Sequence, residues 1–283
     1  MAARAHDADK VAEHPGGVAL VVGAGGGVGR AIALALAEAG YRMALVDRDA
    51  SRLAATSEAV SAHAGHAATP LSAAIDATDT IAVSDLCVRI LAELGTVDVL
   101  VNAAGIYGER RSFAQSDPAL WWQVMEANVK APMVCTRAVL GAMVAKGQGY
   151  VINISSRAST WDDPGASSVA YSTSKAALCR FTSSLAAELA GTGVVVVDLS
   201  PGAVLTGMTA SRPDIGALAP DAFLPASAVA GRAVELVSGR YDELHGRFVH
   251  ARDDLDDLVS RLRSSPAARR LTLAPIDEGD PVA

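Results

Sequence analysis

Tyr171 and Lys175, four positions apart, are the pair in this sequence best suited to acid–base chemistry. In a helix this spacing places the phenol and the ammonium on one face, one turn apart. A neighbouring cation favours the phenolate and lowers the phenol pKa from about 10 toward working pH. The pair therefore predicts a general base for alcohol oxidation. A solvated surface pair has the same spacing, so the surrounding sequence must decide between the two.

Polar side chains follow two apolar runs that read as buried strands. Ser155 and Ser156 follow one run, and Asn102 ends another. Parallel strands present their carboxyl ends at one edge of a sheet, where α/β proteins bind ligands. The first run therefore delivers a serine, Ser155 or Ser156, to the edge where a ligand would bind. Asn128 is a further candidate, because it lies within a predicted helix, where asparagine has only modest propensity.

A glycine-rich turn near the N-terminus predicts a nucleotide site. It follows the apolar run Val18–Val22 and contains five glycines within seven positions. Glycine permits a tight turn and lets the N–H groups at a helix N-terminus approach a pyrophosphate. The candidate cofactor contacts in this turn are Gly23, Gly26, Gly27, Val28 and Gly29.

Asp47 ends the next apolar run, eighteen positions after Gly29. A carboxylate at about this distance holds the adenosine ribose hydroxyls in dinucleotide folds, and its charge repels the 2′-phosphate of NADP. We therefore expect NAD as the cofactor. Arg48 argues for NADP, because an arginine at this place accommodates that phosphate.

A parallel sheet would bring these residues together, and the hydrophobic pattern predicts one. Short β-branched runs alternate with longer Ala/Leu-rich stretches, which is typical of an α/β fold with helices on both faces. We expect a Rossmann-type doubly wound parallel sheet of seven strands in a single domain. The predicted strands are Val18–Val22, Met43–Asp47, Ser72–Asp76, Val97–Asn102, Tyr150–Ser155, Val194–Ser200 and Arg247–Ala251. The predicted helices are Gly27–Ala39, Ala50–Ala64, Asp79–Leu94, Pro118–Lys146, Val169–Ala190 and Ser227–Ser238.

Three regions are expected to lie outside this alternation. Residues 1–17 read as a flexible extension before a catalytic domain over 18–252, and residues 253–283 read as a helix and tail. The predicted C-terminal helix carries an apolar stripe of Leu255, Leu258, Val259 and Leu262. The Pro/Gly-broken stretch from Thr206 to Pro225 is long enough to be a lid.

The composition limits the possible partners. A net charge of −7 gives no basic surface for nucleic acid. The three cysteines are far apart and suggest neither a disulfide framework nor a metal site. No apolar run reaches the length of a signal peptide or a membrane span. We expect a cytoplasmic protein that binds a small molecule, with no metal, nucleic acid or membrane partner.

Together these motifs resemble the short-chain dehydrogenase/reductase family, in its single-domain branch, from about Val18 to Ala251. Val22 stands where the family usually has threonine before its glycines. The glycines fit both the short and the extended branch of the family. The family's glycine, N-A-G and D-x-x-D elements are matched by Gly23, Gly27 and Gly29, by Asn102, Ala103 and Gly105, and by Asp76 and Asp79.

The resemblance implies an NAD(H)-dependent oxidoreductase that moves a hydride between the nicotinamide and a secondary alcohol or ketone. In this reading Tyr171 is the general acid/base, and Lys175 binds the nicotinamide ribose and tunes Tyr171. Ser156 bonds the substrate oxygen, and Asn128 holds a proton-relay water. The further implied cofactor contacts are Asp47, Arg48, Asp76 at the adenine, Ala77, Asn102, Ala103, Gly105, Pro201, Gly202, Val204 and Thr206.

The chain departs from the family pattern in three places. The loop from Ser156 to Tyr171 is two residues longer than usual and contains Trp161. We expect Trp161 to form a wall of the substrate pocket, with structural packing or a contact between subunits as the alternatives. Gly26 stands where a basic residue commonly marks NADP users, which supports NAD. The segment Gly246–Asp254 lacks the usual D-G-G ending, which leaves subunit contacts at that end open.

Two predicted helices, Pro118–Lys146 and Val169–Ala190, look too apolar to be buried on one face alone. As in the family, we expect them to pair across two-fold axes and give a homodimer or homotetramer. One stripe of the second helix carries Leu178, Phe181, Leu185 and Leu189.

Other functions fit parts of the pattern. An NADP-dependent ketoreductase of biosynthetic metabolism would share every motif. A nucleotide-sugar epimerase or dehydratase is disfavoured by the short chain and by the turn at Pro201 and Gly202. A non-catalytic dinucleotide-binding protein would usually lack Tyr171 or Lys175. Neither the substrate nor the direction of the reaction can be read from the motifs.

Overall fold

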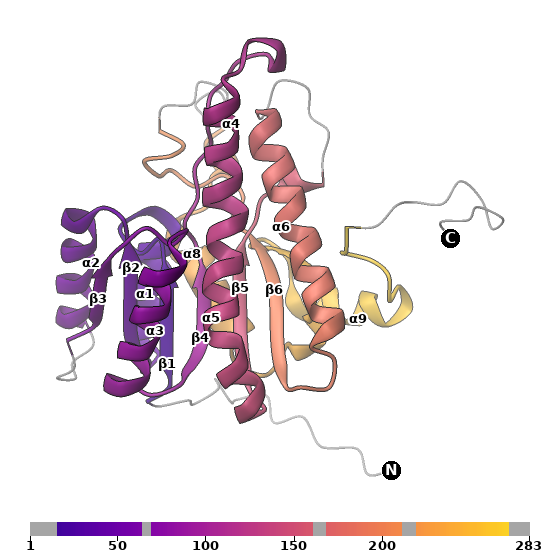
Figure 1. Ribbon diagram of the computed structural model, residues 1–283. Helices are drawn as coiled ribbons and strands as arrows, with labels where there is room; N and C mark the ends of the chain where they lie inside the picture. The colour runs from indigo at the N-terminus through magenta and orange to yellow at the C-terminus, as the bar shows by residue number, and fades with distance from the viewer. Residues whose placement is uncertain (1–15, 64–68, 161–167, 211–218, 272–283) are drawn as a thin grey trace.

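The described residues form a seven-stranded, fully parallel sheet with helices on both faces (Figure 1). The computed structural model describes residues 16–63, 69–160, 168–210 and 219–271. The strand order is β3-β2-β1-β4-β5-β6-β7, so the order reverses between β1 and β4, as in a doubly wound fold. The strands are β1 (Val18–Val22), β2 (Arg42–Asp47), β3 (Leu71–Ala74), β4 (Val97–Asn102), β5 (Gly149–Ile154), β6 (Val194–Ser200) and β7 (Phe248–His250).

The predicted strands are confirmed, with ends that differ by at most two residues. The largest difference is at β3, which ends at Ala74 and not at Asp76. Asp76 instead begins a turn, because its carboxylate accepts a hydrogen bond from the Thr78 N–H at 2.8 Å. A short polar side chain that bonds the backbone two residues on favours a turn over a strand.

The sheet is buried on both faces. Every residue of β1, β5 and β6 is buried. Side chains of successive residues alternate between two apolar clusters, as strand geometry requires. Val21 belongs to the cluster that includes residues of α1 (Gly27–Glu38), α8 (Ala226–Leu236) and α9 (Leu255–Ser264). Leu20 belongs to the cluster that includes residues of α3 (Thr80–Glu93), α5 (Ala131–Lys146) and α6 (Val169–Glu188). The helices are α1 (Gly27–Glu38), α2 (Ala50–His63), α3 (Thr80–Glu93), α4 (Pro118–Met125), α5 (Ala131–Lys146), α6 (Val169–Glu188), α8 (Ala226–Leu236) and α9 (Leu255–Ser264).

The helix predicted over Pro118–Lys146 has these bounds, but it is not a regular α-helix throughout. A π turn over Glu126–Lys130 separates α4 from α5. The cause is visible in the sequence at Pro132, which has no N–H to give to the carbonyl four residues earlier, that of Asn128. The wider turn carries Asn128 inward, where it is fully buried.

The apolar stripe of α6, from Leu178 to Leu189, packs mainly in the core of its own chain. Leu178, Leu185 and Leu189 are buried, and Phe181 packs partly against the same interior. Three of the four side chains of the stripe are therefore closed to a second subunit, and the stripe no longer supports the expected pairing of helices. Among the described residues, no helix combines the length and apolar character that a bilayer span requires.

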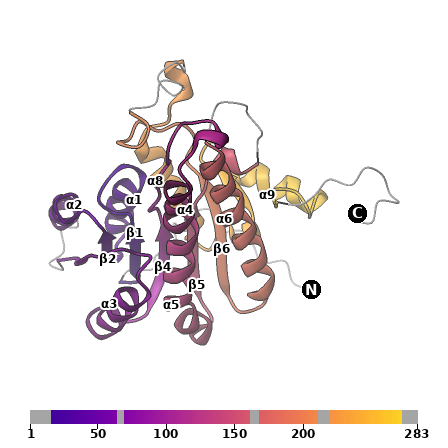
Figure 2. The same cartoon turned by 45° about the horizontal axis from the view of Figure 1, so that its top comes forward.

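The C-terminal helix is confirmed as α9, with Leu255, Leu258 and Leu262 buried. Figure 2 shows α9 at the side of the sheet opposite α2. After α9 the chain returns to β7, where the Phe248 N–H donates to the Arg269 carbonyl at 2.8 Å. This contact covers part of the outermost strand, whose backbone would otherwise be open to pairing.

The turn from β1 to α1 is tight at some glycines and open at another. Gly23 has φ +85°, and a Cβ there would lie 2.4 Å from the Ala104 nitrogen. A Cβ at Gly29 would lie 2.1 Å from the Gly23 carbonyl oxygen. At Gly26 nothing lies within 4 Å. The first two glycines are therefore needed for packing, whereas Gly26 faces open space.

We expect Gly29→Ala to lower the free energy of unfolding by about 2 kcal/mol or more, because the added methyl meets backbone atoms that cannot move aside. Gly26→Ala is the matched control and should change it by less than about 0.5 kcal/mol. Urea unfolding monitored by circular dichroism measures both. Equal midpoints for the two variants would contradict this account of the turn.

Candidate active site

A cavity of about 1360 Å³ runs along the carboxyl ends of the strands. This is the edge at which α/β sheets bind ligands. Most residues predicted from the sequence line it. They are Gly23, Gly26, Gly27, Val28, Gly29, Asp47, Arg48, Asp76, Ala77, Ala103, Gly105, Ser156, Tyr171, Lys175, Pro201, Gly202, Val204 and Thr206, together with the alternative serine, Ser155.

Asp47 lies against the glycine turn. One carboxylate oxygen accepts from the Gly25 N–H and the other from the Asp49 N–H, both at 2.9 Å. These bonds fix the carboxylate at one end of the cavity. Arg48 and Arg52 line the same end, so charges of both signs are present there.

The two aspartates of the D-x-x-D element have different tasks. Asp76 lines the cavity, and the hydrogen bond from the Thr78 N–H lowers the pKa of its carboxyl. Asp79 instead caps α3 and accepts from the Ile81 and Ala82 N–H groups at 2.9 and 3.1 Å. Only Asp76 of the pair is placed to meet a ligand.

Tyr171 and Lys175 lie on one face of α6, as their spacing predicts. The Lys175 Nζ lies 5.7 Å from the centroid of the Tyr171 ring. The same ammonium donates to the Ile154 carbonyl, at the end of β5, at 2.7 Å. Burial lowers the pKa of Lys175 to about 8. A cation is thus held between the phenol and the sheet.

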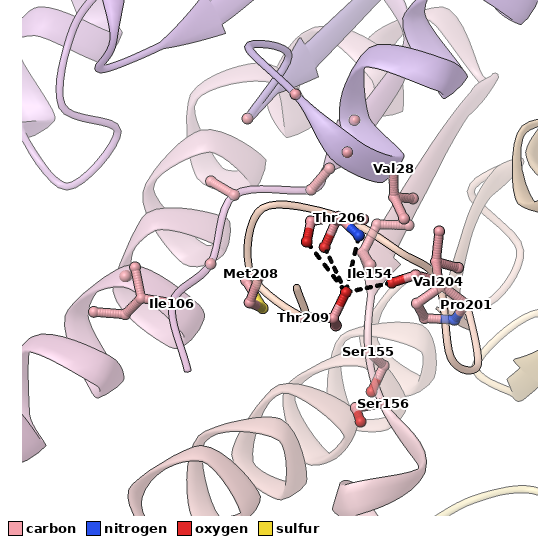
Figure 3. A pocket seen from close by; sticks show the side chains of 18 of the residues that line it. Val28, Ile106, Ile154, Ser155, Ser156, Pro201, Val204, Thr206, Met208 and Thr209 are labelled. Carbon is pink, nitrogen blue, oxygen red and sulfur yellow. Dashed lines mark hydrogen bonds between the residues drawn. The ribbon is translucent and has the colours of Figure 1, made fainter. Parts of the chain in front are cut away.

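The two serines after β5 have different surroundings (Figure 3). Ser155 is buried, and its Oγ lies 3.1 Å from the Cys179 Sγ. Ser156 is half-buried, and its Oγ accepts from the Ala158 N–H at 3.2 Å. A hydroxyl that accepts from the backbone keeps its own proton to donate. Ser156 is therefore the better placed of the two to donate to a ligand.

Two predicted site residues, Asn102 and Asn128, do not line the cavity. Asn102 is buried within the sheet and donates to Asn153 and Thr136. Asn128 clamps the segment after β4, because its amide accepts from the Ile106 N–H at 2.8 Å and donates to the Ile106 carbonyl at 2.9 Å. Both side chains hold the wall of the cavity in place.

Asn128 also reaches α6. Its Nδ2 donates to the Ser174 Oγ at 2.9 Å, and the Ser174 hydroxyl donates to the Tyr171 carbonyl at 2.7 Å. The asparagine therefore links the loop after β4 to the helix that carries Tyr171. Ser174 gave no signal in the sequence, since it is one of several serines in that helix.

Tyr107 was missed by the sequence analysis. Its ring lies 4.8 Å from that of Tyr171, centroid to centroid. Its hydroxyl accepts from the Ser168 N–H at 3.1 Å, and the Ser168 hydroxyl donates to the Tyr107 carbonyl, also at 3.1 Å. Ser168 is the N-cap of α6 and accepts from the Tyr171 N–H. Tyr107 thus helps to fix the start of α6, the helix that carries Tyr171 and Lys175.

The described ends of the predicted lid lie at the cavity. The Thr209 hydroxyl donates to the Val204 carbonyl at 2.6 Å and accepts from the Thr206 N–H at 2.8 Å (Figure 3). At the other end, Arg252 donates to the Asp221 and Ala222 carbonyls. Residues 211–218 and Trp161 lie outside the described residues, so the lid and the pocket wall stay predictions.

Comparison with known proteins gives the family. A sequence model of the short chain dehydrogenases matches residues 17–215. The chain belongs to the short-chain dehydrogenase family. This membership confirms the predicted family and places the chain among oxidoreductases.

Among short-chain dehydrogenases, one from Pseudocercospora fijiensis is 41% identical over 192 residues, which are 67% of this chain and 60% of that protein. One from Emericella variicolor is 32% identical over 88% of this chain and 86% of its own length. A galactitol 2-dehydrogenase (L-tagatose-forming) of Cereibacter sphaeroides is 37% identical over 69% of this chain and 74% of its own length.

Solved structures of the family share the fold. A short-chain type dehydrogenase/reductase from Mycobacterium marinum has a TM-score of 0.78 at 27% identity, over 85% of this chain and 95% of that one. A gluconate 5-dehydrogenase from Burkholderia cenocepacia, solved with NADP and tartrate, has a TM-score of 0.75 at 25% identity, over 85% and 96% of the two chains. A dehydrogenase solved with NADP thus shares the fold of this chain.

We expect Asn128→Ala to lower the free energy of unfolding by about 3 kcal/mol, because groups of Ile106 and Ser174 lose buried partners. Gln123→Ala, an exposed change in the neighbouring α4, is the control and should cost less than about 1 kcal/mol. Thermal unfolding without any ligand measures both. An Asn128→Ala protein as stable as the control would show that the clamp does not hold the wall.

Proposed function

We propose that the chain is an NAD(H)-dependent dehydrogenase or ketoreductase that acts on a secondary alcohol or ketone of a small organic substrate. One observation carries the proposal: Tyr171, Lys175 and Ser156 line the same cavity as the glycine turn and Asp47. An acid–base group and a nucleotide cradle in one cavity are what hydride transfer to and from an alcohol requires.

The residues fit a dinucleotide. Gly26 lines the cavity, and a Cβ at this position would meet no atom within 4 Å. Gly26 is also the N-cap of α1, and the N–H groups and dipole at the N-terminus of a helix favour a pyrophosphate. Asp47 would hold the adenosine ribose, and Asp76 with Ala77 the adenine. Lys175 would hold the nicotinamide ribose, and Arg48, Ala103, Gly105, Pro201, Gly202, Val204 and Thr206 would complete the contacts. When bound, the nicotinamide supplies the hydride acceptor or donor.

The side chains supply the proton chemistry. In alcohol oxidation, the Tyr171 oxygen takes the hydroxyl proton while the Ser156 hydroxyl donates a hydrogen bond to the same substrate oxygen. In ketone reduction, Tyr171 returns the proton. With a pKa of about 8, Lys175 keeps its charge at neutral pH and loses it as the pH rises above that value. Its charge favours the phenolate of Tyr171.

Asn128 is proposed to hold the relay water through its backbone. Its side chain already bonds Ile106 and Ser174. Pro132 removes the N–H that would bond the Asn128 carbonyl in a regular helix. A carbonyl relieved of that partner can accept from a water that exchanges protons with Lys175.

We infer a homodimer or homotetramer that works in the cytoplasm. Trp122 on α4 and Met133 and Val144 on α5 are exposed apolar side chains, which a partner subunit would cover. Met133 and Val144 are eleven residues apart, or three helical turns, so they share one side of α5. The free thiols of Cys87, Cys135 and Cys179 fit a reducing compartment.

The cofactor preference is proposed to be NAD, with NADP as the alternative. Asp47 favours NAD by repulsion of a 2′-phosphate, whereas Arg48 and Arg52 at the same end of the cavity favour NADP. Two backbone N–H groups hold the Asp47 carboxylate in place. This supports a stronger effect of Asp47 than of the two arginines on the choice of cofactor.

We expect Asp47→Asn to raise the ratio of kcat/KM for NADP to that for NAD by about tenfold, which corresponds to a loss of about 1.4 kcal/mol of repulsion. Asp85→Asn, which removes an exposed carboxylate on α3 that does not line the cavity, should leave the ratio unchanged. Steady-state kinetics with both cofactors measure it. A parent enzyme that already prefers NADP would overturn the assignment.

We expect Tyr171→Phe to reduce turnover by at least about a hundredfold, because the phenolic proton acts in the transition state. NADH affinity, measured by fluorescence titration, should stay within about twofold. Lys175→Ala should harm both turnover and NADH binding. Tyr241→Phe removes a hydroxyl far from the cavity and serves as the control. Turnover of Tyr171→Phe within about tenfold of the parent would remove the mechanism.

A further inference from the structure

A row of polar side chains crosses the sheet below the catalytic edge. Asn102 on β4, Asn153 on β5 and Asp198 on β6 are register partners across neighbouring strands. All three are buried, and Thr136 of α5 and Thr182 of α6 meet the row. The central strands of a parallel sheet are usually apolar, so a buried carboxylate in β6 calls for a physical reason.

One chain of hydrogen bonds in the row runs from Asn102 to Asp198. The Asn102 amide donates to the Asn153 oxygen at 2.8 Å, and the Asn153 amide donates to the Thr182 hydroxyl at 2.9 Å. Since that hydroxyl accepts from Asn153, its proton goes to the Asp198 Oδ1, 2.8 Å away. Aligned donors stabilise a negative charge at the end of such a chain. The row is therefore built to end on a carboxylate.

Asp198 also faces the side of α6 that carries Lys175. Lys175, Cys179 and Thr182 are spaced i, i+4 and i+7, so they lie on one face of the helix. The Cys179 thiol bonds both Asp198 and the Ser155 hydroxyl. Asp198 and Lys175 are 2% and 5% exposed. The carboxyl of Asp198 and the ammonium of Lys175 are thus both buried between β6 and α6, where little water screens the interaction between them.

Other charged groups surround Asp198 across a second cavity. It is lined from the turn after β5 by Arg157, from β7 by His250, from the following loop by Asp253 and from the C-terminal segment by Arg269 and Arg270. Arg269 makes two bonds to Asp253, and burial lowers the pKa of His250. Among the described residues, Asp198 forms no direct ion pair, and Lys175 is the cation whose charge acts on it.

We propose that Asp198 is a positioning residue for the reaction, and that its carboxylate is the buried counter-charge that keeps Lys175 protonated beneath Tyr171. The inference rests on the proposed function, because it takes Lys175 as the group that tunes Tyr171. Burial lowers the pKa of Lys175 and raises that of Asp198 to about 7, and the attraction between the two groups opposes both shifts. Removal of the carboxylate charge takes away one of the interactions that oppose the desolvation of Lys175, so the pKa of Lys175 should fall further.

The test is the titration of Lys175 by NMR in protein labelled with ¹³C at the lysine Cε. The chain has lysines only at 10, 130, 146 and 175, and Lys175→Met assigns the signal. We expect Asp198→Asn to lower the pKa of Lys175 by about one unit. Asp253→Asn, which removes a carboxylate from the same second cavity, should leave that pKa unchanged. An unchanged pKa in Asp198→Asn, or equal shifts in both variants, overturns the proposal.

If Asp198→Asn does not fold, a titration of the unmodified protein tests the same proposal. In protein labelled at the aspartate Cγ, Asp198 should be the carboxyl that titrates well above the usual range. The Lys175 signal should respond at the same pH, because the two charges interact. A Lys175 chemical shift that does not change over the pH range in which Asp198 ionises would exclude the counter-charge role.

The NMR titration needs neither cofactor nor substrate, so its outcome is independent of whether the chain oxidises an alcohol. If it does, the alkaline limb of the kcat/KM profile of Asp198→Asn should move to lower pH by the shift seen for Lys175. A merely structural role for Asp198 would lower activity equally at every pH and leave the limb in place.

Discussion

The burial of one ammonium constrains the edge of the sheet that lines the large cavity. Lys175 is 5% exposed, and the Ile154 carbonyl at 2.7 Å is the acceptor that fixes its Nζ. A buried charge is costly unless hydrogen bonds and opposite charge compensate for it. The bond to Ile154 sets where α6 lies against the end of β5. The direction of the Tyr171 ring and the distance from phenol to ammonium follow from that placement.

A frame of hydrogen bonds joins α6 to the segment after β4. Ser168 and Tyr107 exchange bonds at the start of the helix, and Asn128 connects Ile106 to Ser174 further along. These contacts link elements far apart in sequence, so the helix and the strand end are held as one unit. A site built in this way needs little reorganisation when its ligands bind.

Much of the site could be predicted because its signals are local. The spacing of Tyr171 and Lys175, the glycine turn and the position of Asp47 each depend on a few neighbouring residues. Other predictions failed or were incomplete for a tertiary reason. The stripe from Leu178 to Leu189 fits a subunit interface and a core equally well, and only packing shows that it is core. Tyr107 carries no spacing signal, because its partner Ser168 is distant in the chain.

The sequence by itself determined the alternation of strands and helices and the faces on which side chains lie, since both follow from backbone periodicity. It also placed the polar residues at the strand ends. Only the tertiary structure decided which of them face the cavity and which face the interior. Asn102 and Asp198 lie near strand ends like Ser156, yet they turn toward α5 and α6. Their partners come from other strands and helices, so a buried polar group is understood only when its neighbours are in place.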